Sequence, residues 1–125
     1  MDNQFSQKVS EVIIYSKEEA NRLNNGFIGP EHLFLGLLRN GEGKAIEVLS
    51  KLNINFSEIK TVIENKLRET ADPVGFMVDD IVLTTEASKI LKLCILEARL
   101  LKSPVADTEH MLLAILKEKN NMIQL

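Results

Sequence analysis

A ten-residue segment occurs twice in this chain, and its repetition constrains the fold more than any other feature. The two copies cover residues 29–38 and 107–116, and both contain a Glu-His pair, at Glu31-His32 and at Glu109-His110. The offset of 78 residues holds without a gap from the pair Phe5/Leu83 to the pair Asn40/Glu118. Identical pairs are Ser10/Ser88, Glu19/Glu97, Ala20/Ala98, Leu23/Leu101, Glu31/Glu109, His32/His110, Leu35/Leu113 and Leu38/Leu116. Such self-similarity predicts two copies of one structural unit.

The first copy has the periodicity of amphipathic helices. From Phe5 onward, apolar residues fall on one side of a helix that is capped by Ser6 and that ends near Gly26, where a left-handed residue is expected. Ile14 points away from this apolar side and is a predicted surface residue. Three further helices are expected over residues 29–40, 43–52 and 55–67, so that the unit has four helices.

The second copy begins in the same way. Thr84 takes the place of Ser6 at the start of a helix, and Asp107 or Thr108 caps the next one. Residues 90–101 of the first of these helices are apolar around most of its circumference. A helix of that kind is typically buried on two sides, so we expect it at the centre of the domain.

These patterns predict an all-α domain of two pseudo-symmetric repeats of a four-helix unit that share one core. Repeat one is expected over residues 4–69, a connector pinned by Phe76 and Met77 over 70–82, and repeat two over 83–125. Counterparts of residues 48 to about 69 are missing from repeat two. The chain is therefore expected to be a fragment of a longer polypeptide or to carry a shortened repeat, and the fragment is favoured. In either case the incomplete repeat leaves apolar surface open to self-association.

Composition excludes several classes of partner. A net charge of −3 without a basic block argues against nucleic-acid binding. The apolar run Ile90–Leu101 is broken by charges and falls short of the about 20 residues that span a membrane. The first residues lack the pattern of a secretory signal, and the one cysteine, Cys94, lies on the predicted core face. These features favour a cytoplasmic location.

Candidate chemical groups are few, and each has a structural explanation. Glu31 and Glu109 lie in first helical turns, where the helix dipole favours carboxylates. His32 and His110 are expected to bond neighbouring backbone or to pack between helices. Ser6 next to free helix N–H groups suits capping or anion binding, as does Thr84. No metal-ligand spacing, phosphate loop or catalytic constellation is found in the sequence. The residues thus predict a binding module without cofactor or enzymatic activity.

The doubled Glu-His motif, with Glu-Glu-Ala-Asn-Arg-Leu before its first copy and Gly-Glu-Gly-Lys-Ala after it, resembles the amino-terminal domain of Clp-family AAA+ unfoldases. The resemblance is strongest to the ClpC/ClpA type and covers essentially the whole chain. It implies a compact helical domain that receives adaptor proteins and protein substrates. ATP and magnesium would act only in ATPase rings beyond this chain, and a ClpP-type peptidase would degrade what those rings unfold.

The resemblance also implies two phosphoarginine sites related by the repeat. In some bacterial members the motif glutamate meets the guanidinium group and a helix start holds the phosphate. Transferred by position, Glu31 with Ser6 forms one site and Glu109 with Thr84 the other. Ser88 stands where a cationic helper is expected in those members.

Two other classes of function remain open at this point. One is a stand-alone helical interaction module without a motor, which Walker motifs downstream of Leu125 would exclude. The other is an enzyme that uses the Glu-His pairs, which predicts turnover that disappears in Glu31→Ala or His32→Ala variants. The leading hypothesis is docking through surface grooves between the two repeats.

Overall fold

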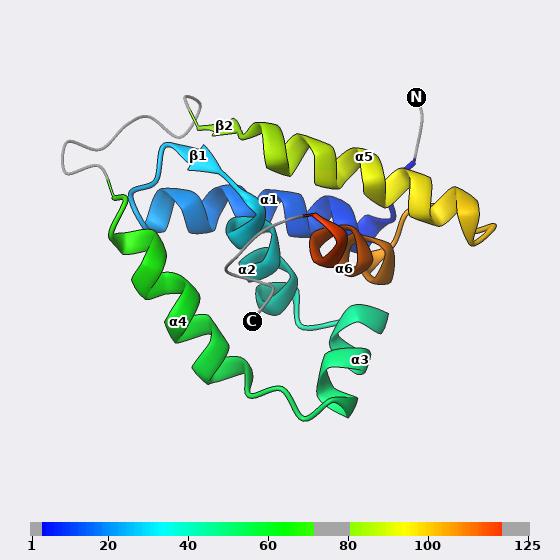
Figure 1. Ribbon diagram of the computed structural model, residues 1–125, viewed down its shortest axis with the longest axis horizontal. Helices are drawn as coiled ribbons and strands as arrows, with labels where there is room; N and C mark the ends of the chain where they lie inside the picture. Colours follow the sequence, from blue (N-terminus) through cyan, green and yellow to red (C-terminus); the bar gives the residue numbers. More distant parts are fainter. Residues whose placement is uncertain (1–3, 72–80, 119–125) are drawn as a thin grey trace.

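A computed structural model describes residues 4–71 and 81–118 of the chain. The described residues form helices and two very short strands in the order α1 Gln7–Arg22, β1 Phe27–Ile28, α2 Pro30–Asn40, α3 Lys44–Lys51, α4 Phe56–Arg68, β2 Val82–Leu83, α5 Thr85–Leu100 and α6 Thr108–Lys117 (Figure 1). The predicted all-α class is confirmed, and repeat one has its four helices. The positions proposed for Phe76 and Met77 lie outside the described residues, as do residues 119–125.

The two repeats agree in local detail. Ser6 accepts a hydrogen bond from the backbone N–H of Val9 at the start of α1, and Thr84 accepts one from Ala87 at the start of α5. Both predicted N-caps are therefore confirmed. The left-handed residue after α1 is Asn24, at φ 59°, and its counterpart after α5 is Lys102, at φ 58°.

The prediction of Gly26 as that left-handed residue was wrong. The helix already turns at Asn24, after which the N–H of Asn25 donates to the carbonyl of Ala20 at 2.8 Å. Asparagine tolerates this conformation better than most residues, and Gly26 is not needed for it.

Two parallel backbone pairings join the repeats, and the sequence analysis did not predict them. Strand β1 pairs with β2, with Ile28 opposite Leu83, and an isolated bridge joins Phe5 to Ala106. These pairings are equivalent, because adding 78 to Phe5 and to Ile28 gives Leu83 and Ala106. In each repeat, the segment before the first helix therefore pairs with the segment before the second helix of the other repeat.

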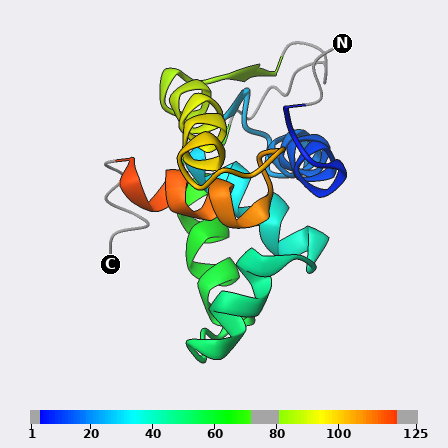
Figure 2. The same cartoon turned by 90° about the vertical axis from the view of Figure 1, so that its right-hand side faces the viewer.

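Helix α2 lies at the centre of the domain. It packs against α1, α3, α4, α5 and α6, whereas α5 packs chiefly against α6. The expected central position of α5 was therefore wrong, and its residues Leu96 and Leu100 are 49% and 74% exposed. Figure 2 shows α3 and α4 extending to the side of the molecule opposite α5.

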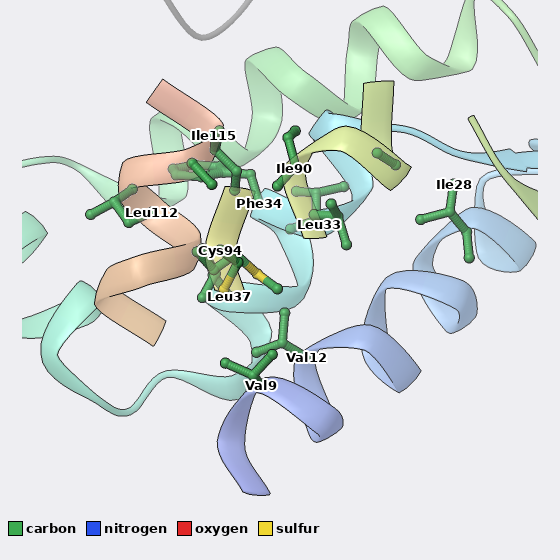
Figure 3. Close-up of a cluster of buried hydrophobic side chains, with 14 of the residues drawn as sticks. Val9, Val12, Ile28, Leu33, Phe34, Leu37, Ile90, Cys94, Leu112 and Ile115 are labelled. Atoms are coloured by element: carbon green, nitrogen blue, oxygen red, sulfur yellow. The ribbon is translucent and has the colours of Figure 1, made fainter. Parts of the chain in front are cut away.

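Both repeats contribute to one continuous apolar core. Residues from the first helix pair and from the second meet there, including Val9, Val12, Leu33, Leu37, Ile90, Cys94 and Ile115 (Figure 3). Within it, α1 and α2 approach closely at Gly36, where an added Cβ would lie 2.6 Å from both Ser16 Oγ and the carbonyl oxygen of Val12. Within the described residues no helix is both long and apolar enough to cross a membrane.

Candidate ligand and partner sites

The crossed pairings bring the start of each first helix beside the start of the other repeat's second helix. The N–H of Ser6 donates to the carbonyl of Ala106 at 2.8 Å, and the N–H of Thr84 donates to the carbonyl of Ile28 at 3.0 Å. Ser6 therefore lies beside the helix that carries Glu109. Thr84 lies beside the helix that carries Glu31.

The four predicted site residues therefore stay a prediction, and the backbone contacts favour a different pairing of them. Transfer by position within one repeat joined Glu31 to Ser6 and Glu109 to Thr84. The structure instead places Ser6 at the start of α6 and Thr84 at the start of α2, because the segments before α1 and α5 exchange between repeats. Sequence repetition alone could not show this exchange.

The site at Ser6 contains a carboxylate of its own. The Ser6 hydroxyl donates to Asp107 Oδ1 at 2.9 Å, and the same oxygen accepts the N–H of Thr108 at 2.8 Å. Within the described ranges, one buried side-chain oxygen has no hydrogen-bond partner, and it is Glu109 Oε1. A buried carboxylate oxygen without a donor favours a ligand that brings one, such as a guanidinium.

The site at Thr84 has glycine in place of that aspartate. Gly29 caps α2 and contributes no side chain. A Cβ built there would lie 3.1 Å from Glu31 Oε1 and 3.6 Å from the Phe27 ring, so a larger residue would crowd the glutamate. The two sites therefore share their backbone arrangement and differ in charge.

Both motif histidines accept a hydrogen bond from a neighbouring backbone N–H, as predicted. His32 Nδ1 accepts the N–H of Gly29 at 2.9 Å, and His110 Nδ1 accepts that of Asp107 at 2.8 Å. His32 Nε2 lies 2.8 Å from Asn25 Oδ1, and it donates there because its other nitrogen is an acceptor. Burial lowers the pKa of His32 to about 4, although the charge of Glu19 opposes the shift.

The buried amide of Asn25 connects this histidine to α4. Its Nδ2 donates to the carbonyl of Leu67 at 3.0 Å, at the end of that helix. The hydroxyl of the equivalent residue, Ser103, donates to the nearby carbonyl of Val105. Sequence reasoning missed Asn25, although its place seven residues before His32 puts it within reach of the imidazole.

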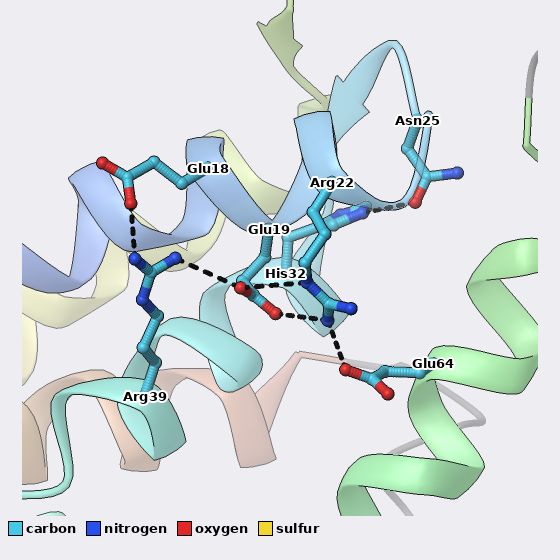
Figure 4. Close-up of polar contacts among 7 residues, drawn as sticks. All are labelled: Glu18, Glu19, Arg22, Asn25, His32, Arg39 and Glu64. Carbon is cyan, nitrogen blue, oxygen red and sulfur yellow. Dashed lines mark hydrogen bonds and ion pairs between the residues drawn. The ribbon is translucent and has the colours of Figure 1, made fainter.

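A second feature that sequence reasoning missed is an ion network around Glu19, which is 5% exposed (Figure 4). Its carboxylate bonds Arg22 at 2.7 Å and Arg39 at 3.2 Å, and Arg22 also pairs with Glu64 of α4. Burial acts to raise the pKa of Glu19, but Arg22 and Arg39 outweigh it and leave the pKa lowered. The identity of Glu19 and Glu97 on an otherwise apolar stripe was the signal available in the sequence.

A pocket of about 460 Å³ adjoins this network. It lies among α1, α2 and α4 and is lined by Glu19, Leu35, Leu38, Arg39, Phe56, Ser57 and Lys60. The lining combines apolar side chains with charged ones. This pocket lies within repeat one rather than between the repeats, where docking grooves were expected.

Other groups have structural roles. Burial raises the pKa of the Cys94 thiol to about 12, with Asp107 and Glu109 adding to the effect, so the thiol is a core group. Within residues 4–71 and 81–118, no cluster of three or more His, Cys, Asp or Glu side chains could hold a metal ion.

The fold and its sites define a class of two-repeat helical domain, and comparison with known proteins identifies its family. Residues 4–125 match the family of the Clp repeat (R) N-terminal domain. The chain belongs to this family.

Relatives and solved structures agree with that assignment. The chain is 36% identical over 118 residues to the ATP-dependent Clp protease ATP-binding subunit ClpA homolog of Cyanidium caldarium, covering 94% of this chain and 14% of that protein. It is also 36% identical over 118 residues to the chloroplastic chaperone protein ClpC2 of Arabidopsis thaliana, covering 94% of this chain and 12% of the relative. The chain thus spans a small part of these relatives.

Two solved structures share the fold at low sequence identity. The Hsp104 N-terminal domain of Candida albicans superposes with a TM-score of 0.80 at 15% identity, covering 97% of this chain and 78% of that one. The ClpD N-terminal domain of Arabidopsis thaliana gives 0.75 at 16% identity, covering 94% and 79%.

Proposed function

We propose that this chain is the docking domain through which a Clp-type unfoldase receives adaptor proteins and protein substrates. The family assignment supports this function, as does the similarity to ClpA-type and ClpC-type relatives. Ser6 and Thr84 cap helices and the motif histidines bond backbone N–H groups, which suits recognition rather than catalysis. In this proposal the domain itself is non-catalytic.

The proposal places the energy-using steps elsewhere in the assembly. ATP and magnesium act in ATPase rings, and a ClpP-type peptidase degrades the unfolded substrate. The domain binds its protein partners without a cofactor, in the cytoplasm. The share of the relatives that this chain matches, 12–14% of their length, is consistent with one domain of a larger machine.

One observation carries the proposal: the first helix of repeat two starts beside the segment of repeat one that holds the motif glutamate. Thr84 begins α5 beside the α2 segment that holds Glu31, joined by the hydrogen bond to Ile28. A carboxylate suits a guanidinium, and free N–H groups at a helix start suit a phosphate. This combination fits phosphoarginine in a marked substrate.

The two sites are unequal in this proposal. At Ser6 the carboxylate of Asp107 already accepts the hydroxyl hydrogen bond and would repel a phosphate. At Thr84 the equivalent residue is Gly29, which brings no charge. The Glu31–Thr84 site therefore accepts the anionic ligand, and the Glu109–Ser6 site favours an unmodified guanidinium.

Calorimetric titration tests this assignment. Free phosphoarginine and a phosphoarginine peptide are titrated into the intact domain and into Glu31→Ala, Glu109→Ala and the double variant. We expect saturable binding that Glu31→Ala abolishes and Glu109→Ala leaves nearly unchanged.

Unmodified arginine peptide is titrated in the same way; its binding should disappear in Glu109→Ala and persist in Glu31→Ala. Absence of phosphoarginine binding to the intact domain at millimolar concentration would remove phosphoarginine from the proposal and leave adaptor proteins as its ligands. Equal losses in the two single variants would contradict the inequality of the sites.

A further inference from the structure

An aromatic ring lies beside the motif glutamate of repeat one. Phe27 belongs to β1, two residues before Gly29, and its side chain is half-buried. A Cβ added to Gly29 would lie 3.6 Å from the Phe27 ring and 3.1 Å from Glu31 Oε1. The ring and the carboxylate therefore line one gap, which any side chain at residue 29 would fill.

The pairing of β1 with β2 places this gap on the same face as the start of α5. Phe27 is opposite Val82 in the parallel register, and the N–H of Thr84 donates to the carbonyl of Ile28. Side chains alternate along extended strands, so Phe27 shares a face with residue 29, whereas Ile28 points into the core. By the same alternation Val82 shares its face with Thr84.

The motif histidine holds the ring in place. The rings of Phe27 and His32 pack edge to face, with centroids 5.2 Å apart and an interplanar angle of 83°. His32 is fully buried and is bonded to the N–H of Gly29 and to the side chain of Asn25. The ring of Phe27 is therefore positioned before a ligand arrives, which lowers the entropic cost of binding.

Repeat two has neither the ring nor the gap. Val105 stands at the position of Phe27, and Asp107 at that of Gly29. The two sites therefore differ in an aromatic group as well as in charge.

The domain already binds one of its own arginines with a ring and carboxylates together. The guanidinium of Arg39 lies over the ring of Tyr15, 4.7 Å from its centroid. The same guanidinium bonds Glu18 at 2.7 Å and Glu19 at 3.2 Å (Figure 4). A planar guanidinium can present its edge to a carboxylate and its face to an aromatic ring, which the compact ammonium of lysine cannot do.

We propose that Phe27 is a further binding residue of the Glu31–Thr84 site, where its ring packs on the guanidinium group that Glu31 binds by its edge. The inference rests on the proposed function, because it concerns the same site. It assigns part of the affinity to a residue outside the repeated Glu-His motif. Repeat two lacks this contribution, because valine has no ring.

Calorimetric titration of free phosphoarginine tests the role of the ring. We expect the dissociation constant to rise at least about threefold in Phe27→Leu, since a cation over an aromatic face contributes that much at a partly exposed site. Phe27→Tyr keeps the ring and should stay within about twofold of the unaltered domain. The matched control is Phe56→Leu, which removes a half-buried ring of α4 and should leave the affinity unchanged.

The NMR spectrum of the ligand separates direct stacking from an indirect effect through His32. Ring currents should shift the δ-methylene protons of phosphoarginine upfield in the unaltered domain and in Phe27→Tyr, and this shift should be lost in Phe27→Leu. Circular dichroism confirms that each variant is folded. If Phe27→Leu does not fold, magnetisation transfer from the Phe27 ring protons to the bound ligand in the unaltered domain decides.

The possible failures are distinguishable. Phosphoarginine binding of unchanged affinity in folded Phe27→Leu, or binding without the upfield shift, would overturn the role of Phe27 and leave the proposed function intact. An equal loss of affinity in Phe56→Leu would overturn it as well, because the effect would not be local. Absence of phosphoarginine binding to the unaltered domain would remove both the phosphoarginine site and the role of Phe27.

Discussion

Helices α1 and α5 have matching N-caps, and α2 and α6 begin with the same histidine–backbone bond, but the surroundings of the two pairs differ. In repeat one, α4 packs against α2, and its Glu64 pairs with Arg22 of α1. In repeat two the equivalent surface exposes leucines. The comparison teaches that a repeated sequence determines the direction of a side chain, whereas its burial depends on what packs against it.

The largest contrast is expected for one pair of identical leucines. Leu35→Ala removes a side chain that is 1% exposed and should lower the free energy of unfolding by about 2–5 kcal/mol. Leu113→Ala removes one that is 36% exposed and should cost about 1 kcal/mol or less, because little packing is lost. Urea unfolding measures both, and equal losses would contradict the difference in burial.

Acid should destabilise repeat one through His32. Its pKa of about 4 in the fold lies below the ordinary value of 6.5, so the unfolded chain binds the proton more tightly. Stability is fully present above pH 6.5 and falls by up to about 3 kcal/mol as the pH drops toward 4. The lowered pKa of Glu19 adds a further loss below about pH 4.5.

Urea unfolding from pH 7.5 to 4 checks this prediction, with His32→Gln as the control. The variant keeps a hydrogen-bonding side chain but has no imidazole to protonate. Its stability should change much less between pH 6.5 and 4.5. An unaltered pH profile would show that His32 is not the group responsible.

The helix contact at Gly36 provides a smaller contrast. Gly36→Ala places a Cβ against Ser16 Oγ and the backbone of Val12, so it should cost about 1–3 kcal/mol by overpacking. Repeat two already has Ala114 at the equivalent position, and Ala114→Gly should cost about 1 kcal/mol through helix propensity. Thermal unfolding compares the two, and a stabilising Gly36→Ala would show that α1 and α2 can move apart.

The smallest effects are expected at the helix caps. Thr84→Ala should cost about 1 kcal/mol, because the N–H of Ala87 loses its acceptor. Ser6→Ala should cost about 2 kcal/mol, since it also removes the donor to Asp107. Chemical unfolding of both variants checks the order, and a larger loss for Thr84→Ala would contradict it.

Local sequence signals were sufficient to predict the helices of repeat one and the N-caps at Ser6 and Thr84, although not the residue that ends α1. Helix boundaries depend on local signals, namely the spacing of apolar residues and the capping residues Ser6, Thr84, Asn55 and Gly41. The structure shows the expected cap at each of these four residues. The structural roles of His32 and His110 follow from the same first-turn geometry.

The crossing of the repeats could not be predicted in this way. The segments at Phe5 and Leu83 could each pair with the segment before the second helix of either repeat. These two partner segments are chemically similar, so the sequence does not distinguish them. For that reason the transfer by position paired Ser6 with Glu31, whereas the backbone contacts place Ser6 beside the helix that carries Glu109. Likewise, the apolar character of α5 was interpreted as central burial, whereas Leu96 and Leu100 on this helix are 49% and 74% exposed.

The unequal sites are tested most directly by phosphoarginine titration of Asp107→Gly beside the unaltered domain. This change gives repeat two the residue that repeat one has at Gly29, and glycine is tolerated at a helix N-cap. The account predicts one phosphoarginine site in the unaltered domain and two in the variant, with the second lost on Glu109→Ala. Two equal sites before the substitution, or an unchanged stoichiometry after it, would contradict the account.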